Sequence, residues 1–215
     1  DQFAYNEKKR EELRNQLLIQ DKFVIGHVGR FSPVKNHKYL LEILEACMEQ
    51  MKQKEVILLL VGDGPLREEI MEQAIAKGLS SHVIFVGNQR EVWDYYQAMD
   101  FFLLPSFYEG LPGTAIEAQC SGLPCILSDT ITREAGVTDL LIYKDIRDNA
   151  TEWADYIIDN KITKCESIKS YIEINATIDA ECARRSYVKE VEAVGFNVKL
   201  QAKEMMQLYT KKTKW

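Results

Sequence analysis

The sequence predicts an α/β domain organised around a doubly wound, parallel β-sheet of about six strands. Short apolar segments, such as FVIGHVG at residues 23–29 and VILLLV at residues 56–61, alternate along the chain with segments of helical composition. Nearly continuous apolar runs are typical of parallel strands that are buried on both faces. Because this alternation requires right-handed crossovers, we expect helices on both faces of the sheet.

The length and composition fit one globular domain of this kind or two small ones. The chain has 215 residues, of which 46% are hydrophobic and 28% are charged, so it can bury a full core without disulfides or metal ions. Its net charge of −6 argues against a nucleic-acid partner, and an anionic ligand would need a local group of cations. The cysteines lack a Cys-x-x-Cys pair and indicate free thiols in a reducing cytoplasm: Cys47, Cys120, Cys125, Cys165 and Cys182.

Neither a secretion signal nor a membrane span is predicted, and we expect a cytoplasmic protein. The chain contains no run of about 18 apolar residues, and its first residues, DQFAYNEKKREEL, lack the apolar core of a signal peptide. Residues 6–20 are charged and amphipathic with no strand before them, so we expect residues 1–22 to be a linker and leading helix after a missing N-terminal domain. The basic tail at residues 211–215 predicts a solvated end, with weak peripheral membrane contact as the alternative.

The first unit consists of a strand, a loop and a helix. Residues 23–29 are the strand, and residues 37–52 have helical spacing with an apolar face formed by Leu40, Leu41, Leu44 and Met48. The loop between them carries Arg30 and Lys35 at the carboxyl end of the strand, where parallel sheets bind ligands. We interpret the two cations as an anion site, and the alternative is a pair of solvated surface charges.

The next two units contain strands at residues 55–61 and 82–87, followed by helices at residues 66–77 and 91–98. Gly62-x-Gly64 lacks the third glycine and the acidic partner of a dinucleotide-binding fingerprint. We therefore interpret it as a structural turn that could also border a ligand. The aromatic residues of the second helix are expected in the core or an interface rather than stacked on a base: Trp93, Tyr95 and Tyr96.

The stretch after the fourth strand carries the strongest functional signal. Residues 101–105 form that strand, the turn from Gly110 to Gly113 ends it, and residues 114–120 have helical composition. Such a junction directs free backbone N–H groups and the positive helix end outward, where anions bind. Glu109 and Glu117 flank the turn. We expect a ligand with a diphosphate in its middle and sugars at both ends, because carboxylates bind sugar hydroxyls well.

The two carboxylates differ in how easily they are explained without a ligand. Thr114-Ala115-Ile116-Glu117 also matches a Ser/Thr-x-x-Glu capping box, in which Glu117 would only satisfy a backbone N–H group at the helix start. Both explanations stay open for Glu117. Glu109 lies between Tyr108 and Gly110 at a strand end and has no capping or periodic role, which favours a functional role.

The last predicted elements complete the sheet and add helices after it. Residues 124–127 and 140–143 read as the fifth and sixth strands, and residues 149–159 as a helix. Two further helices are predicted at residues 176–194 and 199–209, separated by Gly195-Phe196-Asn197.

The central stretch resembles a known enzyme family. Two Glu residues separated by seven residues, opening with Glu-Gly-Leu-Pro at 109–112 and closing with Ala-x-x-x-Gly-Leu-Pro at 118–124, are similar to retaining glycosyltransferases of group 1. These include bacterial capsule and exopolysaccharide enzymes and have the GT-B fold of two Rossmann-like domains. The resemblance implies that Glu109 faces the donor sugar and Glu117 holds the ribose. It also implies that the N–H groups between Gly110 and Gly113 meet the phosphates.

The first loop resembles the same family. Gly29-Arg30 followed by Lys35 is similar to the Gly-Arg…Lys signature that grips the donor diphosphate, although this chain has Asn36 where many relatives have Gly. The resemblance implies catalytic roles for Glu109, Arg30 and Lys35. The implied nucleotide-sugar-binding residues include a base-contacting segment at 86–88: Gly29, Arg30, Lys35, Val86, Gly87, Asn88, Glu109, Gly110, Leu111, Pro112, Gly113, Thr114 and Glu117.

A metal ion is not expected at this site. The histidines at positions 27, 37 and 82 have no ligand-like spacing, and the chain has no Asp-x-Asp sequence. In the resembled family, Arg and Lys take the place of Mg²⁺.

The resemblance implies that residues 23–210 are the donor-binding, C-terminal half of a GT-B enzyme. Such a hexosyltransferase would transfer a sugar from a nucleoside-diphosphate sugar, with UDP favoured over GDP, to a glycan or lipid-linked acceptor. Cell-surface polysaccharide synthesis is the expected setting, and the missing N-terminal domain would bind the acceptor. A non-catalytic nucleotide-sugar-binding regulatory module and a sugar-nucleotide epimerase are the alternatives.

Overall fold

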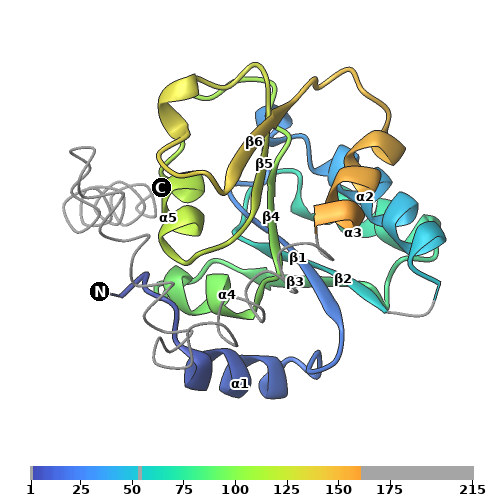
Figure 1. The fold of residues 1–215 in the computed structure, drawn as a ribbon. Coiled ribbons are helices and arrows are strands. Elements are labelled where there is room, and N and C mark those ends of the chain that lie inside the picture. Colours follow the sequence, from blue (N-terminus) through green and yellow to red (C-terminus); the bar gives the residue numbers. More distant parts are fainter. Residues whose placement is uncertain (1, 53–54, 161–215) are drawn as a thin grey trace.

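The fold is an α/β domain with a six-stranded parallel sheet in the order β3-β2-β1-β4-β5-β6. A computed structural model describes residues 2–52 and 55–160 (Figure 1). The strands are β1 (Phe23–Val28), β2 (Val56–Val61), β3 (Val83–Gly87), β4 (Phe101–Leu104), β5 (Cys125–Ser128) and β6 (Leu141–Lys144). The chain runs outward from β1 to β3, returns to the other side of β1 as β4, and runs outward again to β6. The predicted doubly wound parallel sheet is confirmed.

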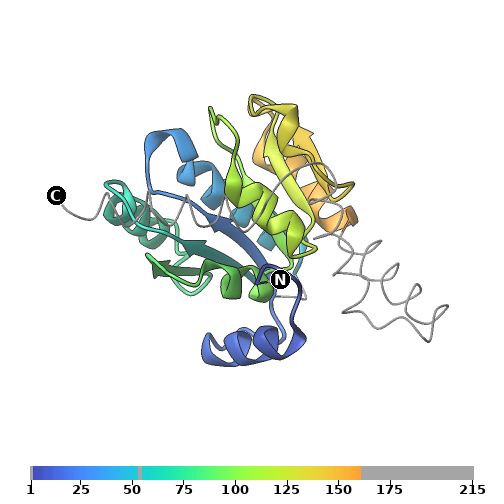
Figure 2. The same cartoon turned by 90° about the vertical axis from the view of Figure 1, so that its left-hand side faces the viewer.

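Helices cover both faces of this sheet (Figures 1 and 2). One face is covered by α1 (Glu7–Gln16), α4 (Val92–Ala98) and α5 (Gly113–Cys120). The other is covered by α2 (His37–Gln50), α3 (Arg67–Ala76) and a helix at residues 150–160. The helices predicted at residues 176–194 and 199–209 lie outside the described residues.

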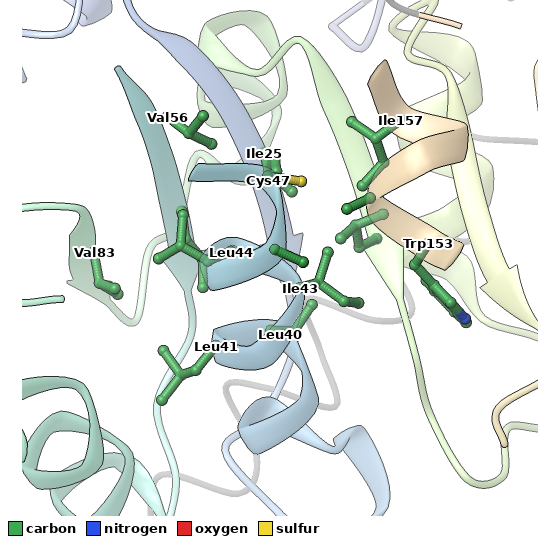
Figure 3. Packing of buried hydrophobic residues seen from close by; sticks show 14 of the residues in the cluster. Ile25, Leu40, Leu41, Ile43, Leu44, Cys47, Val56, Val83, Trp153 and Ile157 are labelled. Carbon is green, nitrogen blue, oxygen red and sulfur yellow. The ribbon is translucent and has the colours of Figure 1, made fainter. Parts of the chain in front are cut away.

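The core on the second face shows why these segments fold as predicted. The apolar face of α2, with Leu40, Leu41 and Leu44, is fully buried against strands β1 and β2, as the helical spacing predicted. Trp153 and Ile157 from the helix at residues 150–160 complete the same cluster (Figure 3). Met48 is only partly buried at the margin of the cluster. Burial of these side chains fixes the strands from which the loops at the carboxyl edge of the sheet emerge.

The leading helix α1 is fastened to the amino edge of the sheet by charged side chains. Arg10 donates hydrogen bonds to the carbonyl oxygens of Gln97 and Met99, each at 2.8 Å. Both Arg10 and Arg14 form ion pairs with Asp100, which directly precedes β4. None of the described helices has the length and apolar character that crossing a membrane requires.

Candidate functional site

The loops that follow β1 and β4 meet at the carboxyl edge of the sheet. β1 and β4 are neighbours, yet α2 leaves β1 toward one face and α5 leaves β4 toward the other. Doubly wound sheets bind ligands in the crevice at such a switch point. The backbone N–H of Phe107 donates to the carbonyl oxygen of Val34 at 2.9 Å and ties the two loops together.

Lys35 and Glu109, predicted from separate motifs, form an ion pair between these loops. The Nζ atom of Lys35 lies 2.6 Å from Oε1 of Glu109, and the side chains are 17% and 14% exposed. Each of three N–H bonds of a Lys ammonium group can serve a different acceptor. An ammonium group in this position can therefore hold Glu109 and still bind a phosphate oxygen.

The backbone of the first loop places Lys35 at the end of a short 3₁₀ turn, η1 (Pro33–Lys35). Asn36 follows it with a left-handed backbone, φ 54°, and α2 begins at the next residue. Glycine is favoured in this conformation, and asparagine is among the few other residues that adopt it readily. The loop geometry therefore accommodates Asn36 where the resembled family often has Gly.

Arg30 lies beside the glycine turn that follows β2. Its side chain is exposed and runs next to Gly64, with Cγ 3.0 Å from where a Cβ atom of residue 64 would lie. Gly62 has φ 136°, and a Cβ atom there would overlap the carbonyl oxygen of Gly29. The Gly62-x-Gly64 turn thus allows two loops to approach closely, which agrees with its predicted structural role.

The turn before α5 differs from the capping-box alternative. Helix α5 begins at Gly113 with Pro112 as its N-cap and has no side-chain capping bond, so Thr114 lies inside the first turn. The hydroxyl of Thr114 is buried and has no hydrogen-bond partner among the described residues. The capping-box explanation of Glu117 is therefore wrong, because the helix starts two residues too early for Thr114 to be its N-cap. The first amides of the helix, at Gly113 and Thr114, precede the intrahelical hydrogen bonds and are available to an anion.

Glu117 lies one helical turn beyond Gly113 and contacts α4. Its Oε2 atom accepts a 2.8 Å hydrogen bond from the hydroxyl of Tyr96. Burial raises the pKa of Glu117 to about 7, and the hydrogen bond from Tyr96 opposes this rise. Sequence reasoning expected Tyr96 only in the core or an interface. Its contact with Glu117 joins residues 21 positions apart on different helices, and no local pattern reveals it.

Two histidines without ligand-like spacing meet beneath the first loop. The rings of His27 and His37 are 4.8 Å apart, and Phe31 stacks on His37 at 4.0 Å. Nδ1 of His27 is 2.9 Å from the carbonyl oxygen of Leu103. Burial lowers the pKa of His37 to about 4 and that of His27 well below its usual value, so both are neutral at pH 7. Within residues 2–52 and 55–160, no three His, Cys, Asp or Glu residues are grouped to hold a metal ion.

The segment predicted to meet the base lies at the end of β3, two strands away from β1. The carbonyl oxygen of Gly87 accepts a 2.9 Å hydrogen bond from the amide of Gly62. Residues 86–88 thus border the glycine turn beside Arg30 rather than the Lys35–Glu109 pair itself. The site residues form a row along the carboxyl edge, from β3 past β2 and β1 to β4.

Four exposed hydrophobic side chains belong to the two loops that carry Lys35 and Glu109. The exposed side chains are Phe107 (54%), Tyr108 (70%), Val34 (42%) and Leu111 (41%). Leu111 belongs to the turn that was predicted to meet the phosphates through its N–H groups. That role of the turn stays a prediction.

Comparison with known proteins relates the sequence to a family. Residues 9–164 match the family model described as Glycosyl transferases group 1. EpsF of Bacillus subtilis, named as a glycosyltransferase, is 40% identical over 149 residues, covering 68% of this chain and 38% of EpsF. The UDP-Gal:alpha-D-GlcNAc-diphosphoundecaprenol alpha-1,3-galactosyltransferase of Escherichia coli is 33% identical over 113 residues, covering 52% of this chain and 29% of the enzyme. The chain thus spans less than two fifths of either relative.

Solved structures show the same fold. HepE of Anabaena, in complex with UDP and glucose, superposes with a TM-score of 0.71 at 20% identity, covering 97% of this chain and 54% of HepE. The C-terminal domain of the group 1 glycosyl transferase LpcC from Francisella tularensis has a TM-score of 0.63 at 17% identity. That match covers 89% of this chain and 94% of the LpcC domain, so the fold is that of a GT-B C-terminal half.

Proposed function

This chain belongs to the group 1 glycosyltransferases, and on that premise we propose that it is the donor-binding domain of a retaining enzyme that uses a UDP-sugar. The donor sugar would pass to a glycan or lipid-linked acceptor in cell-surface polysaccharide synthesis. Support for UDP over GDP comes from HepE, whose structures contain UDP and UDP-glucose, and from the E. coli relative named for UDP-Gal. Because the chain covers 38% of EpsF, we propose that the acceptor site lies in a domain outside it.

The observation that carries this proposal is the Lys35–Glu109 pair at the switch point, next to the amino end of α5. A diphosphate bound there would receive hydrogen bonds from Lys35, from Arg30 and from the amides of the 110–114 segment. Glu109, held by Lys35, would then face the hydroxyl groups of the donor sugar. One arrangement thus serves both the charged and the sugar part of the donor.

The same groups give a mechanism for catalysis. Breaking the bond between sugar and phosphate places negative charge on the leaving nucleoside diphosphate. Arg30, Lys35 and the turn amides would stabilise that charge more strongly in the transition state than in the ground state. We propose that these two cations, rather than a divalent metal ion, provide this stabilisation, while Glu109 orients the sugar.

The remaining site residues are proposed to hold the nucleoside. Residues 86–88 would contact the base through their backbone, since they border the glycine turn on the β3 side of Arg30. Glu117 would accept hydrogen bonds from the ribose hydroxyls. In this proposal the ligand runs along the carboxyl edge of the sheet, and its diphosphate lies over the first loop.

Titration calorimetry on this chain tests the proposal. UDP should bind with the same affinity with and without EDTA, and Lys35→Ala should weaken it at least about tenfold. Lys77→Ala is the matched control, because Lys77 forms an ion pair of equal length, 2.6 Å, with Glu45 away from the site. Binding that EDTA abolishes would contradict the metal-free site. Equal affinities in the two Lys variants would remove Lys35 from it.

A sugar-transfer assay tests the proposal that the acceptor site lies in a domain outside this chain. This chain alone should transfer no sugar, because catalysis requires donor and acceptor to be held together, a gain of about 10⁵–10⁸ M in effective concentration. Efficient transfer by residues 1–215 would refute this assignment. If a longer protein containing both domains also transferred nothing, the alternative of a non-catalytic regulatory module would be favoured.

A further inference from the structure

Tyr96 connects the two helices that flank β4. Its ring belongs to α4, and its hydroxyl lies 2.8 Å from Oε2 of Glu117 and 3.2 Å from the carbonyl oxygen of Thr114, both on α5. These helices lie on the same side of the sheet (Figures 1 and 2). Tyr96 therefore contacts both a proposed ribose-binding carboxylate and the first turn of the proposed phosphate-binding helix.

The position of the Tyr96 hydroxyl is fixed by core packing. The residue is only 1% exposed, and its ring lies 6.4 Å from Phe3 and 6.0 Å from Phe102. A group held by packing in this way can orient the side chain that it contacts. By contrast, the neighbouring Tyr95 is only partly buried, and Glu117 is not among the groups that affect its pKa.

We propose that Tyr96 is a positioning residue that orients Glu117 and thereby makes the site select ribonucleotides over deoxynucleotides. The inference rests on the proposed function, because it assumes that a nucleoside diphosphate is the ligand. A phenol has one proton to donate, and the ionised carboxylate accepts it at Oε2. Oε1 is then left to accept a hydrogen bond from a ribose hydroxyl.

Selectivity follows from the cost of leaving Glu117 without its ribose partner. A site built to hydrogen-bond a hydroxyl discriminates strongly against the analogue that lacks it, since the buried polar group is left unpaired. Without the Tyr96 hydroxyl, the Glu117 side chain can rotate and be hydrated. An analogue without ribose hydroxyls would then lose little relative to UDP.

The protonation of Glu117 provides a second, independent readout. Burial raises the pKa of Glu117 to about 7, and Tyr96 lowers it by hydrogen bonding to the charged form. Loss of that hydrogen bond should move the pKa further upward. The other titratable groups on the elements around α5 form no hydrogen bond or ion pair with Glu117 within the described part of the chain: Asp94 and Tyr95 on α4, and Arg133 and Glu134 on the 3₁₀ turn η2 (Arg133–Ala135).

The experiment compares UDP with 2′,3′-dideoxy-UDP from pH 6 to pH 9, in the wild type, Tyr96→Phe and the matched control Tyr95→Phe. The ratio of the two dissociation constants at each pH cancels the titration of the phosphates, which both nucleotides share. The wild type and Tyr95→Phe should favour UDP at least about tenfold above pH 7, with the ratio falling below it. In Tyr96→Phe the ratio should drop below about threefold, and its midpoint should move to higher pH.

Two results would overturn the inference while leaving the proposed function intact: a wild-type ratio in Tyr96→Phe, or an equal loss in Tyr95→Phe. A lower melting temperature with an unchanged ratio and pH profile would show that Tyr96 has only a structural role. Absence of UDP and GDP binding in the wild type would overturn both proposals. If Tyr96→Phe does not fold, site-specific 3-fluorotyrosine at position 96 replaces it. This nearly isosteric, stronger donor should move the midpoint to lower pH, and an unchanged midpoint would refute the inference.

Discussion

Two groups of charged side chains lie at opposite ends of the same pair of strands, β1 and β4. At the amino edge, Asp100 forms ion pairs with Arg10 and Arg14 and also accepts a 2.8 Å hydrogen bond from the amide of Val24. Other guanidinium donors of these two residues bind backbone carbonyl oxygens, including that of Ala98. At the carboxyl edge, Lys35 and Glu109 form an ion pair, while Arg30 is exposed and makes no hydrogen bond or ion pair with the described residues.

The difference separates charges that stabilise the fold from charges that we propose bind a ligand. The amino-edge group has its donors and acceptors matched within the protein, so removing one member leaves a charge uncompensated. At the carboxyl edge, Lys35 and Arg30 have N–H donors that no described residue accepts. The buried hydroxyls of Ser106 and Thr114 also have no hydrogen-bond partner among the described residues. Similar residue types at the two edges are therefore expected to respond to mutation in opposite ways.

The largest expected effect is on stability at the amino edge. Asp100→Ala leaves Arg14, which is buried, without its carboxylate, and should lower the free energy of unfolding by about 3 kcal/mol. Urea denaturation measures this change, with Asp155→Ala on the exposed part of the helix at residues 150–160 as a control. The affinity of the folded variant for UDP should stay unchanged. If Asp100→Ala were as stable as the control, the ion pairs of Asp100 would not stabilise the fold.

The next effect is on binding at the carboxyl edge. Arg30→Ala should weaken UDP binding at least about tenfold, since a charge-assisted hydrogen bond contributes about 1.5–3 kcal/mol. The unfolding free energy should change by less than about 0.5 kcal/mol, because the exposed side chain has no partner to lose. Calorimetry and urea denaturation of the same preparation provide both values. If Arg30→Ala were less stable but bound UDP with unchanged affinity, Arg30 would stabilise the fold, as Arg14 does, and would not bind the ligand.

A smaller effect concerns the pH dependence of stability at Glu117. Because the folded-state pKa is raised from 4.5 to about 7, the contribution of Glu117 is fully present below pH 4.5 and is lost as pH rises to about 7. Glu117→Gln should therefore gain about 1–2 kcal/mol relative to the wild type between these pH values, while binding UDP more weakly. Glu134→Gln on the exposed η2 turn is the control. Parallel stability curves for wild type and Glu117→Gln would contradict this account.

The smallest effect is expected at Asn36. Asn36→Gly removes the strain of the left-handed backbone but makes the unfolded chain more flexible, so stability should change by less than about 1 kcal/mol. Asn36→Val should destabilise more, because β-branched residues avoid positive φ. UDP affinity should follow the same order, since the turn positions Lys35. Equal stability of the Gly and Val variants would show that the loop does not depend on this backbone conformation.

The sequence predicted the elements well because their signals are local. The apolar runs at residues 56–61 and 101–104 are buried, as continuous apolar runs predict. The apolar face of α2 is also buried, as its helical spacing predicts. The sequence also predicted that Lys35 and Glu109 lie at the same edge of the sheet, because the carboxyl ends of parallel strands share an edge. The roles of these residues in binding and catalysis stay predictions.

Contacts between distant side chains could not be predicted in this way. Three such contacts depend on strand order and helix packing, which no short pattern encodes: Asp100 with Arg10, His27 with His37, and Tyr96 with Glu117. The capping-box alternative failed for a related reason. Thr114 has the right spacing to Glu117, but the preceding turn lets the helix begin at Gly113, and this moves the cap to Pro112.

The central claim is that the carboxyl edge binds a nucleoside diphosphate while the amino edge only stabilises the fold. The most direct measurement is an NMR titration of the ¹⁵N-labelled chain with UDP in the presence of EDTA. The account predicts amide shift changes in residues 29–37, 86–88 and 109–117, and unchanged signals around Arg10, Arg14 and Asp100. Changes centred on the amino edge, or no changes at saturating UDP, would contradict it.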